Sequence, residues 1–293
     1  YTRGIYGCNL KNGNKVQTFP VKSVSGSPAD NTRRDPSVAY DNFNEEFIVA
    51  WSDNRNSTDG YTYDLYAAAV GIAESGTITV ETEEMYSHGT YYENISIEYN
   101  NYWDNACAIW TSDYKPYYLL TSGAWTPELA YGSELIYPEE YNEQLFCGTP
   151  SIAANTNQNS FVVAYPASLT SWDGSGVIYL KLIGEPVEYE PMASINPALA
   201  YNPGENNYLL VYANQEYNEY YAARLSDTEN PSGETSYVND PGIVGQFISN
   251  TAEAQGRPFR ISKALKDIHY YSEGDFPDVA YGDGKYLVVW AEE

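Results

Sequence analysis

The chain has 293 residues and carries 40 Asp and Glu against 15 Lys and Arg, a formal net charge of −25 at pH 7. This charge repels polyanions, so it argues against nucleic acid and anionic membrane surfaces as partners. The apolar runs are short, the longest being of the kind at residues 65–70. None approaches the ~20 apolar residues of a membrane-spanning helix, so no membrane insertion is expected.

Tyrosine dominates the aromatic residues, with 31 Tyr against 8 Phe and 6 Trp. A Tyr ring can be buried while its hydroxyl stays in water, which suits half-buried strands and surfaces that face sugars or proteins. The sequence opens on Tyr1 without a charged and apolar leader, so we expect a processed chain whose targeting segment has been removed. The three cysteines are too few for a disulfide scaffold.

Five segments of the chain resemble one another, and each predicts a β-hairpin. In the first, residues 36–40 (PSVAY) lead through turn-forming residues to residues 47–51 (FIVAW). The equivalent segments are 95–110, 150–165, 197–212 and 277–290. The first residue and the closing aromatic are 15 positions apart in four segments and 13 in the last, so the last hairpin has a shorter turn.

A Tyr inside a short apolar run predicts a third strand after four of the hairpins, at 65–67, 117–119, 178–180 and 220–222. The fifth copy of this run stands at the opposite end of the chain, at 5–7, and is followed by a fourth strand at 16–21. Other fourth strands are predicted at 77–80, 134–137, 186–189 and 259–262. No segment with helical periodicity is long enough to compete.

These elements predict an all-β fold, a single five-bladed β-propeller over residues 1–293 with four antiparallel strands per blade. The N-terminal strands complete the blade begun by the C-terminal hairpin, which closes the ring and removes its open edges. The expected blades are about 36–86, 94–140, 150–194, 197–263 with an insertion at 227–256, and 277–293 together with 1–23.

The first blade carries the clearest resemblance to a known family. Residues 51–56 (WSDNRN), running on to 63–66 (YDLY), resemble the VVWxDxR…DIY propeller repeats of secreted or surface bacterial and archaeal proteins, loosely similar to TolB-type propellers. The resemblance covers the whole chain at the level of a repeat, although no other blade keeps the pair Asp53 and Arg55, and Ile95 stands where the others have Pro. It implies an extracellular or envelope module, usually non-enzymatic, and no particular ligand.

In a propeller, the loops from strand two to strand three and from strand four to the next blade surround the central channel, where ligands usually bind. On that face we expect ligand-binding residues at Arg34, Asp53, Arg55, Trp172, Asp173 and His269. Two alternatives stay open. Asp53 and Asp64 could hold Arg55 only to latch a loop. Trp172 could stack on a sugar ring or anchor its loop.

Three carboxylates, Asp35, Asp113 and Asp275, support an alternative, catalytic hypothesis. Five-bladed glycosidases of the arabinanase and β-xylosidase type use three carboxylates at the channel mouth. If the chain resembles them in architecture, these three residues would lie at its own channel mouth. Against this, the residue directly before the first (inner) strand of each blade is acidic only at Asp35. The other four blades carry Asn94, Thr149, Asn196 and Phe276 at this position. In so acidic a chain this pattern favours coincidence.

No metal or cofactor site is predicted. Residues 53–60 offer oxygen ligands for Ca²⁺, but Arg55 stands where a second carboxylate is needed. Weak Ca²⁺ binding is therefore the one metal interaction left as an alternative. His88 and His269 are both expected in loops of blades that are not neighbours, which favours surface histidines. Cys107 and Cys147 could approach each other across a blade interface, or be buried as small apolar side chains.

The preferred hypothesis is a non-catalytic extracellular or cell-surface module that binds glycans or protein partners, or forms a structural unit of an extracellular assembly. It rests on the regular repeat, the acidic and Tyr-rich composition and the absence of a concentrated set of catalytic residue types. The alternative is the glycoside hydrolase.

Overall fold

The computed structural model describes residues 4–11, 14–22, 33–57, 63–81, 84–90, 93–112, 115–120, 146–168, 176–183, 192–214, 242–262 and 277–290. All the regular elements in these ranges are β-strands, so the all-β prediction is confirmed. None of the described segments is a helix able to cross a membrane. The chain divides into unit 1, residues 1–113 and 117–135, and unit 2, residues 114–116 and 136–293, and each unit has a core of its own.

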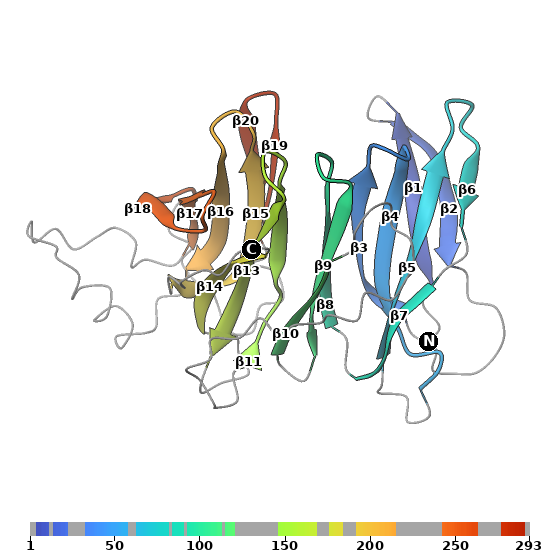
Figure 1. Cartoon of the computed structure of the whole chain (residues 1–293), viewed down its shortest axis with the longest axis horizontal. Helices are drawn as coiled ribbons and strands as arrows, with labels where there is room; N and C mark the ends of the chain where they lie inside the picture. The colour runs from blue at the N-terminus through green and yellow to red at the C-terminus, as the bar shows by residue number, and fades with distance from the viewer. Residues whose placement is uncertain are drawn as a thin grey trace, which may run out of the picture. The chain divides into compact units, whose positions relative to one another are not determined.

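The five predicted hairpins are present as antiparallel strand pairs, two of them in unit 1 and three in unit 2 (Figure 1). They are β3 (Arg33–Asp41) with β4 (Glu46–Asp53), β8 (Glu93–Asn100) with β9 (Asn105–Ser112), β12 (Ser151–Asn155) with β13 (Ser160–Ser168), β15 (Met192–Asn202) with β16 (Asn207–Asn214), and β19 (Asp278–Gly282) with β20 (Lys285–Val289).

An Asp or Asn side chain organises each of the four longer turns. Asp41 Oδ1 accepts hydrogen bonds from the backbone N–H of Phe43 at 2.8 Å and of Asn44 at 3.1 Å. The same acceptor position is occupied in the other turns by Asn100, Asn155 and Asn202. The fifth turn is the short one, and both of its residues, Asp283 and Gly284, have a positive φ of 50° and 74°. Two such residues make the tight turn that matches the twist of a hairpin.

Third strands pair with the second strands as predicted in three of the repeats. They are β5 (Tyr63–Ile72), β10 (Lys115–Leu120) and β14 (Gly176–Ile183). The aromatic that closes the second strand stacks on a Tyr of the third strand, as Trp51 does on Tyr66 with 6.2 Å between ring centroids. The equivalent stacked pairs are Trp110 with Tyr117 and Tyr165 with Tyr179. These pairs are the physical basis of the Tyr pattern in the sequence.

The prediction for the third strand of the fourth repeat is wrong. β16 pairs with β15 on one side and with β17 (Gly242–Ser249) on the other, so β17 is the third strand of this repeat, whereas the predicted residues 220–222 lie outside the described residues. β17 and the first three residues of β18 (Ala254–Arg260) fall inside the segment 227–256 that was predicted as an insertion. Val244 stands opposite Tyr212, and β17 therefore lacks the Tyr on which the prediction relied.

The fourth strands are partly as predicted. β6 (Ile78–Val80) pairs with β5, and β18, which overlaps the predicted strand at 259–262, pairs with β17. β7 (Glu84–Thr90) was not expected and pairs with the other half of β5. The two-residue strand β11 (Phe146–Cys147) pairs with the end of β13. The predicted strands at 134–137 and 186–189 lie outside the described residues.

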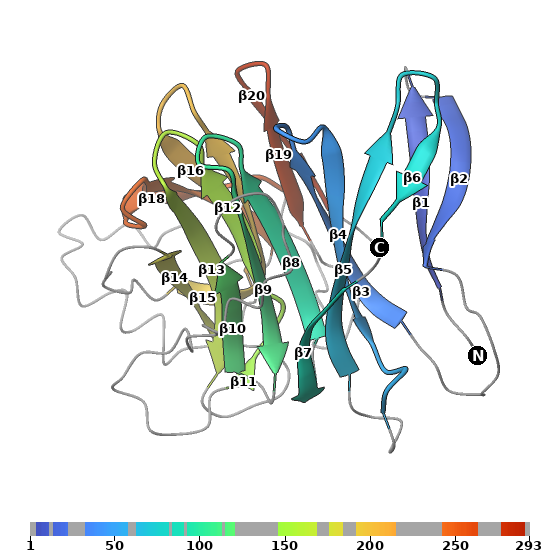
Figure 2. The ribbon, with the colours of Figure 1, turned by 45° about the vertical axis from the view of Figure 1, so that its right-hand side comes forward.

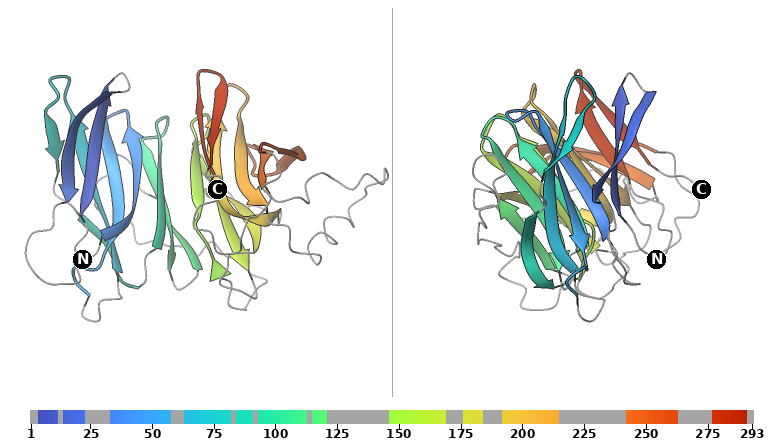
Figure 3. Two further views of the ribbon diagram at one scale, coloured as in Figure 1. Left: turned by 180° about the vertical axis from the view of Figure 1, so that it is seen from behind. Right: turned by 90° about the vertical axis from the view of Figure 1, so that its right-hand side faces the viewer.

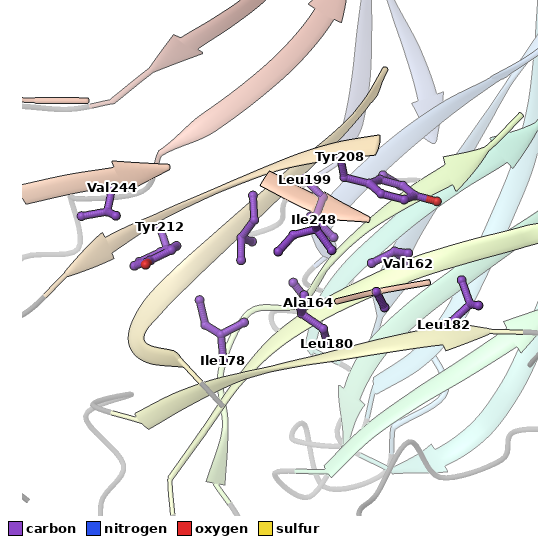
Figure 4. Close-up of a cluster of buried hydrophobic side chains, with 13 residues drawn as sticks. Val162, Ala164, Ile178, Leu180, Leu182, Leu199, Tyr208, Tyr212, Val244 and Ile248 are labelled. Carbon is purple, nitrogen blue, oxygen red and sulfur yellow. The ribbon is translucent and has the colours of Figure 1, made fainter. Parts of the chain in front are cut away.

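Neighbouring sheets within a unit pack face to face. In unit 2 the β13–β14 face, with Val162 and Leu180, packs against Leu199, Tyr208 and Ile248 from β15, β16 and β17 (Figure 4). In unit 1 the β3, β4 and β5 face packs in the same way against β8, β9 and β10. Six consecutive residues of β4 are buried, because this strand has a neighbouring layer on both of its faces.

The two ends of the chain form separate two-stranded sheets. β1 (Ile5–Lys11) pairs with β2 (Asn14–Lys22), as predicted, and β19 pairs with β20. Within the described residues no ladder joins β1 to β20. The shared fifth blade, and with it the closed ring of five blades, therefore remains a prediction.

Candidate functional site

The connection from β4 to β5 contains the best-defined polar cluster on the predicted ligand face. We call it the Arg55 cluster, and its members are Asp53, Arg55, Asn56, Asp64 and Tyr66. Asp53 ends β4 and stands directly opposite Asp64 in β5, and both carboxylates are buried. Two like charges in such a cross-strand pair repel each other unless a cation or hydrogen-bond donors compensate them.

Arg55 and Asn56 supply that compensation. The Arg55 backbone N–H donates to Asp53 Oδ1 at 2.9 Å and its Nε to Oδ2 at 2.7 Å, while Nη2 forms an ion pair with the same oxygen. Asn56 Nδ2 donates to Asp64 Oδ2 at 3.0 Å and to Tyr66 Oη at 2.7 Å. The guanidinium lies 4.2 Å from the centre of the Tyr66 ring, a cation–π contact.

The cluster also changes the acidity of Tyr66. Burial raises the pKa of its hydroxyl, the Arg55 charge acts in the opposite direction, and the Asp64 and Asp53 carboxylates raise the pKa further. The hydroxyl thus stays protonated at neutral pH, with Asn56 as a donor to its oxygen. The structure brings Asp53 and Arg55 together as predicted, in the geometry of a latch between two strands.

Asp35 lies in β3 at a β-bulge rather than at a free loop end. The β3–β4 register shifts between Arg34 and Ser37, and Asp35 has a positive φ of 53°. Equivalent bulges place Asn94 and Asn196 at φ of 56° and 51°. Asp and Asn tolerate this left-handed conformation better than most residues. The preference at this position in the sequence therefore reflects backbone geometry.

The Asp35 carboxylate has a structural partner. Its Oδ2 accepts a hydrogen bond from the backbone N–H of Asn94 at 3.3 Å, which connects the bulges of the first two repeats. Arg34 pairs with Ser52 in the β3–β4 ladder. Asp113 and Asp275 lie outside the described residues, so the three-carboxylate hypothesis stays a prediction.

The remaining predicted residues are placed as follows. Trp172, Asp173 and His269 lie outside the described residues, as does the last part of the candidate Ca²⁺ loop at 58–60. His88 was expected in a loop and lies instead in β7, because the chain pairs with β5 before it enters the next repeat. In the described part of the chain no three His, Cys, Asp or Glu residues are grouped so that they could hold a metal ion.

Cys107 is a free and fully buried thiol in β9, and burial raises its pKa well above the usual range. It stands opposite Glu98 in the β8–β9 ladder. Cys147 lies in β11. In the described part of the chain, Cys107 thus behaves as the small apolar side chain that was one of the two predicted alternatives.

Sequence reasoning missed an aromatic group at the other end of the strands. Phe43, Tyr102 and Trp103 are exposed in the turns β3–β4 and β8–β9. A position-by-position alignment of the four 16-residue hairpin segments would have found them, because the equivalent turn positions of the third and fourth repeats are Asn157, Gln158, Gly204 and Glu205.

Comparisons with known proteins give similarity of shape only. No protein-family model and no curated protein matches the chain. Among solved structures, a chain of the nidogen/laminin complex matches with a TM-score of 0.46 and 9% identity, over 98% of this chain and 82% of that one. The Dos1 propeller matches with a TM-score of 0.46 and 12% identity, over 88% and 66%.

A third structure, the Trypanosoma rangeli sialidase in complex with the inhibitor DANA, matches with a TM-score of 0.49 and 8% identity, over 94% of this chain. The chain spans only 45% of that protein. Similarity at this level assigns neither a family nor an activity to the chain.

Proposed function

We propose that the chain is a closed five-bladed β-propeller that acts as a non-catalytic extracellular or cell-surface module and binds a glycan or protein partner. Closure is supported by two apolar faces, one in the first repeat and one in the last, that are exposed although the equivalent faces of other repeats are buried. The extracellular placement rests on the resemblance of residues 51–66 to secreted propeller repeats.

The first of these faces, the leading face, consists of Val38 and Tyr40 on β3. Val38 is 58% exposed, whereas its equivalents Ile97, Leu199 and Val279 are 3%, 7% and 8% exposed. Within each unit these equivalents pack against the preceding repeat, as Ile97 does against Ala39 and Ile48. The leading face thus lacks the inner strands of a preceding blade.

The second, the trailing face, consists of Leu287 and Val289 on β20, which are 67% and 52% exposed. Their equivalents in the first repeat, Ile48 and Ala50, are buried against the second repeat. A trailing face that meets the leading face would bury both, and both are apolar.

The β1–β2 hairpin occupies the place of outer strands on the leading side. Ile5, Phe19 and Val21 pack against Val49 and Trp51 of unit 1, and the hairpin lies over β4 and β5 (Figure 3). It covers the outer part of that side and leaves Val38 exposed. The β1–β2 hairpin therefore offers candidates for strands three and four of the shared blade, and β19–β20 has the pattern of strands one and two.

Two junctions inside the units repeat one hydrogen bond. Ser37 Oγ accepts from the backbone N–H of Ile97 at 3.0 Å, and Ser151 Oγ accepts from Leu199 at 3.1 Å. Both join the second residue of one inner strand to the third residue of the next. Two junctions with the same contact support a similar packing of successive blades, as expected in a closed ring.

The roles of the described polar groups support the non-catalytic assignment. Asp53, Arg55 and Asp64 hold two strands together, and Asp35 bonds to the backbone of the next repeat. Because these polar groups are used to stabilise the scaffold, we expect other groups on the loops and turns to bind the ligand.

The test has two arms. The purified chain is applied to a glycan array and to a panel of extracellular proteins, with and without Ca²⁺, and is incubated with plant and microbial polysaccharides. We expect binding without release of sugar. Hydrolysis by the parent that is lost in Asp35→Asn would establish the hydrolase instead, and a parent that neither binds nor hydrolyses would refute the proposal.

A further inference from the structure

Two neighbouring turns of unit 1 present exposed aromatic rings. Phe43 is 57% exposed in the β3–β4 turn, and Tyr102 and Trp103 are 65% and 48% exposed in the β8–β9 turn. The turns lie at the same end of their strands (Figure 2) and are joined by a hydrogen bond of 3.1 Å from the Asn42 backbone N–H to Asn101 Oδ1. We call Phe43, Tyr102 and Trp103 the turn patch.

Hydrogen bonds to Asn100 hold the backbone that carries Tyr102 and Trp103. Asn100 Oδ1 accepts from the Tyr102 N–H at 3.1 Å, and the Asn100 carbonyl accepts from the Trp103 N–H at 3.2 Å. The Tyr102 and Trp103 rings are 5.3 Å apart with 70° between their planes, so they form the two walls of a corner. The hydrogen-bonded turn lowers the backbone entropy that ligand binding would cost.

The turns do not need these rings in order to form. The β12–β13 and β15–β16 turns make the same side-chain to backbone bonds through Asn155 and Asn202. At the positions equivalent to Tyr102 and Trp103, the second and third after this Asn, they carry Asn157 with Gln158 and Gly204 with Glu205. Aromatic residues at these positions therefore expose apolar area to water and are not needed to form the turn. This exposure points to a ligand.

The size and charge of the turn patch define the ligand. A stable protein interface buries about 800 Å² on each partner, far more than three partly exposed rings present. A single sugar ring, with an apolar face and hydroxyl edges, suits a corner of two aromatic rings in turns that also carry the polar residues Asn42 and Asn101. The same two turns carry the acidic residues Glu45 and Asp104, which together with the net charge of −25 repel anionic sugars.

We propose that the turn patch is a binding site for neutral glycans, in which the corner of Tyr102 and Trp103 holds one sugar ring. This inference rests on the proposed binding function and assigns it to the turn end of the strands, away from the Arg55 cluster.

The experiment compares the parent with the double variant Tyr102→Asn, Trp103→Gln, which borrows the residues of the third repeat's own turn. Cello-, xylo-, manno-, laminari- and chitohexaose are titrated by calorimetry. Gln158→Ala, at the equivalent position of another repeat, is the control. Far-UV circular dichroism and the melting temperature verify that each variant is folded.

We expect the parent and Gln158→Ala to bind at least one of these sugars and the double variant to bind it about tenfold or more weakly, as for truncated aromatic anchors. Tyr102→Phe, which keeps the ring, should retain binding. Equal affinity of the double variant and the parent would overturn the inference while the binding function stands. A parent that binds only proteins would overturn the inference alone, and a parent that binds nothing would overturn both.

Discussion

Replacement of Leu287 by Ala tests the closed ring most directly. In the closed ring Leu287 takes the place that Ile48 has between the first two repeats, where Ile48 is fully buried. Truncation of a buried Leu or Ile to Ala costs about 2–5 kcal/mol, because the lost transfer free energy is joined by the cost of a cavity. Truncation of an exposed Leu changes stability by less than about 0.5 kcal/mol.

The assay is urea and thermal unfolding of Leu287→Ala beside two reference variants of the same chain. Ile48→Ala gives the cost at a buried equivalent, and Phe43→Ala gives the cost at an exposed position. With a shift of about 2–4 °C per kcal/mol, the closed ring predicts a melting temperature lowered by about 5–15 °C.

A double-mutant cycle with Val38→Ala then asks whether the two faces touch. Val38 and Leu287 correspond to Ile97 and Ile48, which belong to one cluster, so the closed ring predicts a coupling free energy of about 0.5–3 kcal/mol. If Leu287→Ala unfolds like Phe43→Ala and the coupling is zero within error, the two ends do not meet and the ring is open.

Three further predictions follow from contacts in the structure. Arg55→Met should lower the free energy of unfolding by about 3 kcal/mol in urea titrations, because the buried Asp53 then loses its cation while it still faces Asp64; unchanged stability would rule out the latch. Asp41→Ala should cost about 1 kcal/mol and Asp41→Asn almost nothing, since Asn makes this turn in three other repeats; equal costs would contradict the turn argument. Burial raises the pKa of Tyr286 from 10.0 to about 12, so its contribution is complete below pH 10 and is lost as the pH rises towards 12; alkaline unfolding, followed by circular dichroism, should therefore steepen in this window, and a flat profile would refute it.

The hairpins could be predicted because their determinants are local. Apolar strands of fixed length and an Asp or Asn at the start of each turn lie within 15 positions of one another, and the short fifth turn was visible in its spacing. The third strands with a Tyr were found for the same reason, since that Tyr stacks on the aromatic of the preceding strand. β17 was missed because Val244 fills the place of that Tyr and because about 30 residues separate β17 from β16.

The roles of the polar residues could not be derived in this way. Asp35 was named in the sequence only as a candidate catalytic acid, and its pattern was attributed to coincidence; its left-handed backbone and its bond to Asn94 appear only in three dimensions. Part of the Arg55 cluster could be predicted, because Asp53 and Arg55 are close in sequence. The hydrogen bond from Asn56 to Asp64 could not, because it depends on how β4 pairs with β5.

By itself the sequence determined the all-β class, the five hairpins and the turns that close them, because each depends on residues close together along the chain. Only the tertiary structure decided which groups from different repeats meet. Asn42 and Asn101, 59 positions apart, bring two aromatic turns side by side, and the uncovered Val38 and Leu287 mark the faces that are expected to join. Contacts between repeats depend on the packing of whole sheets, and no local pattern of residues encodes them.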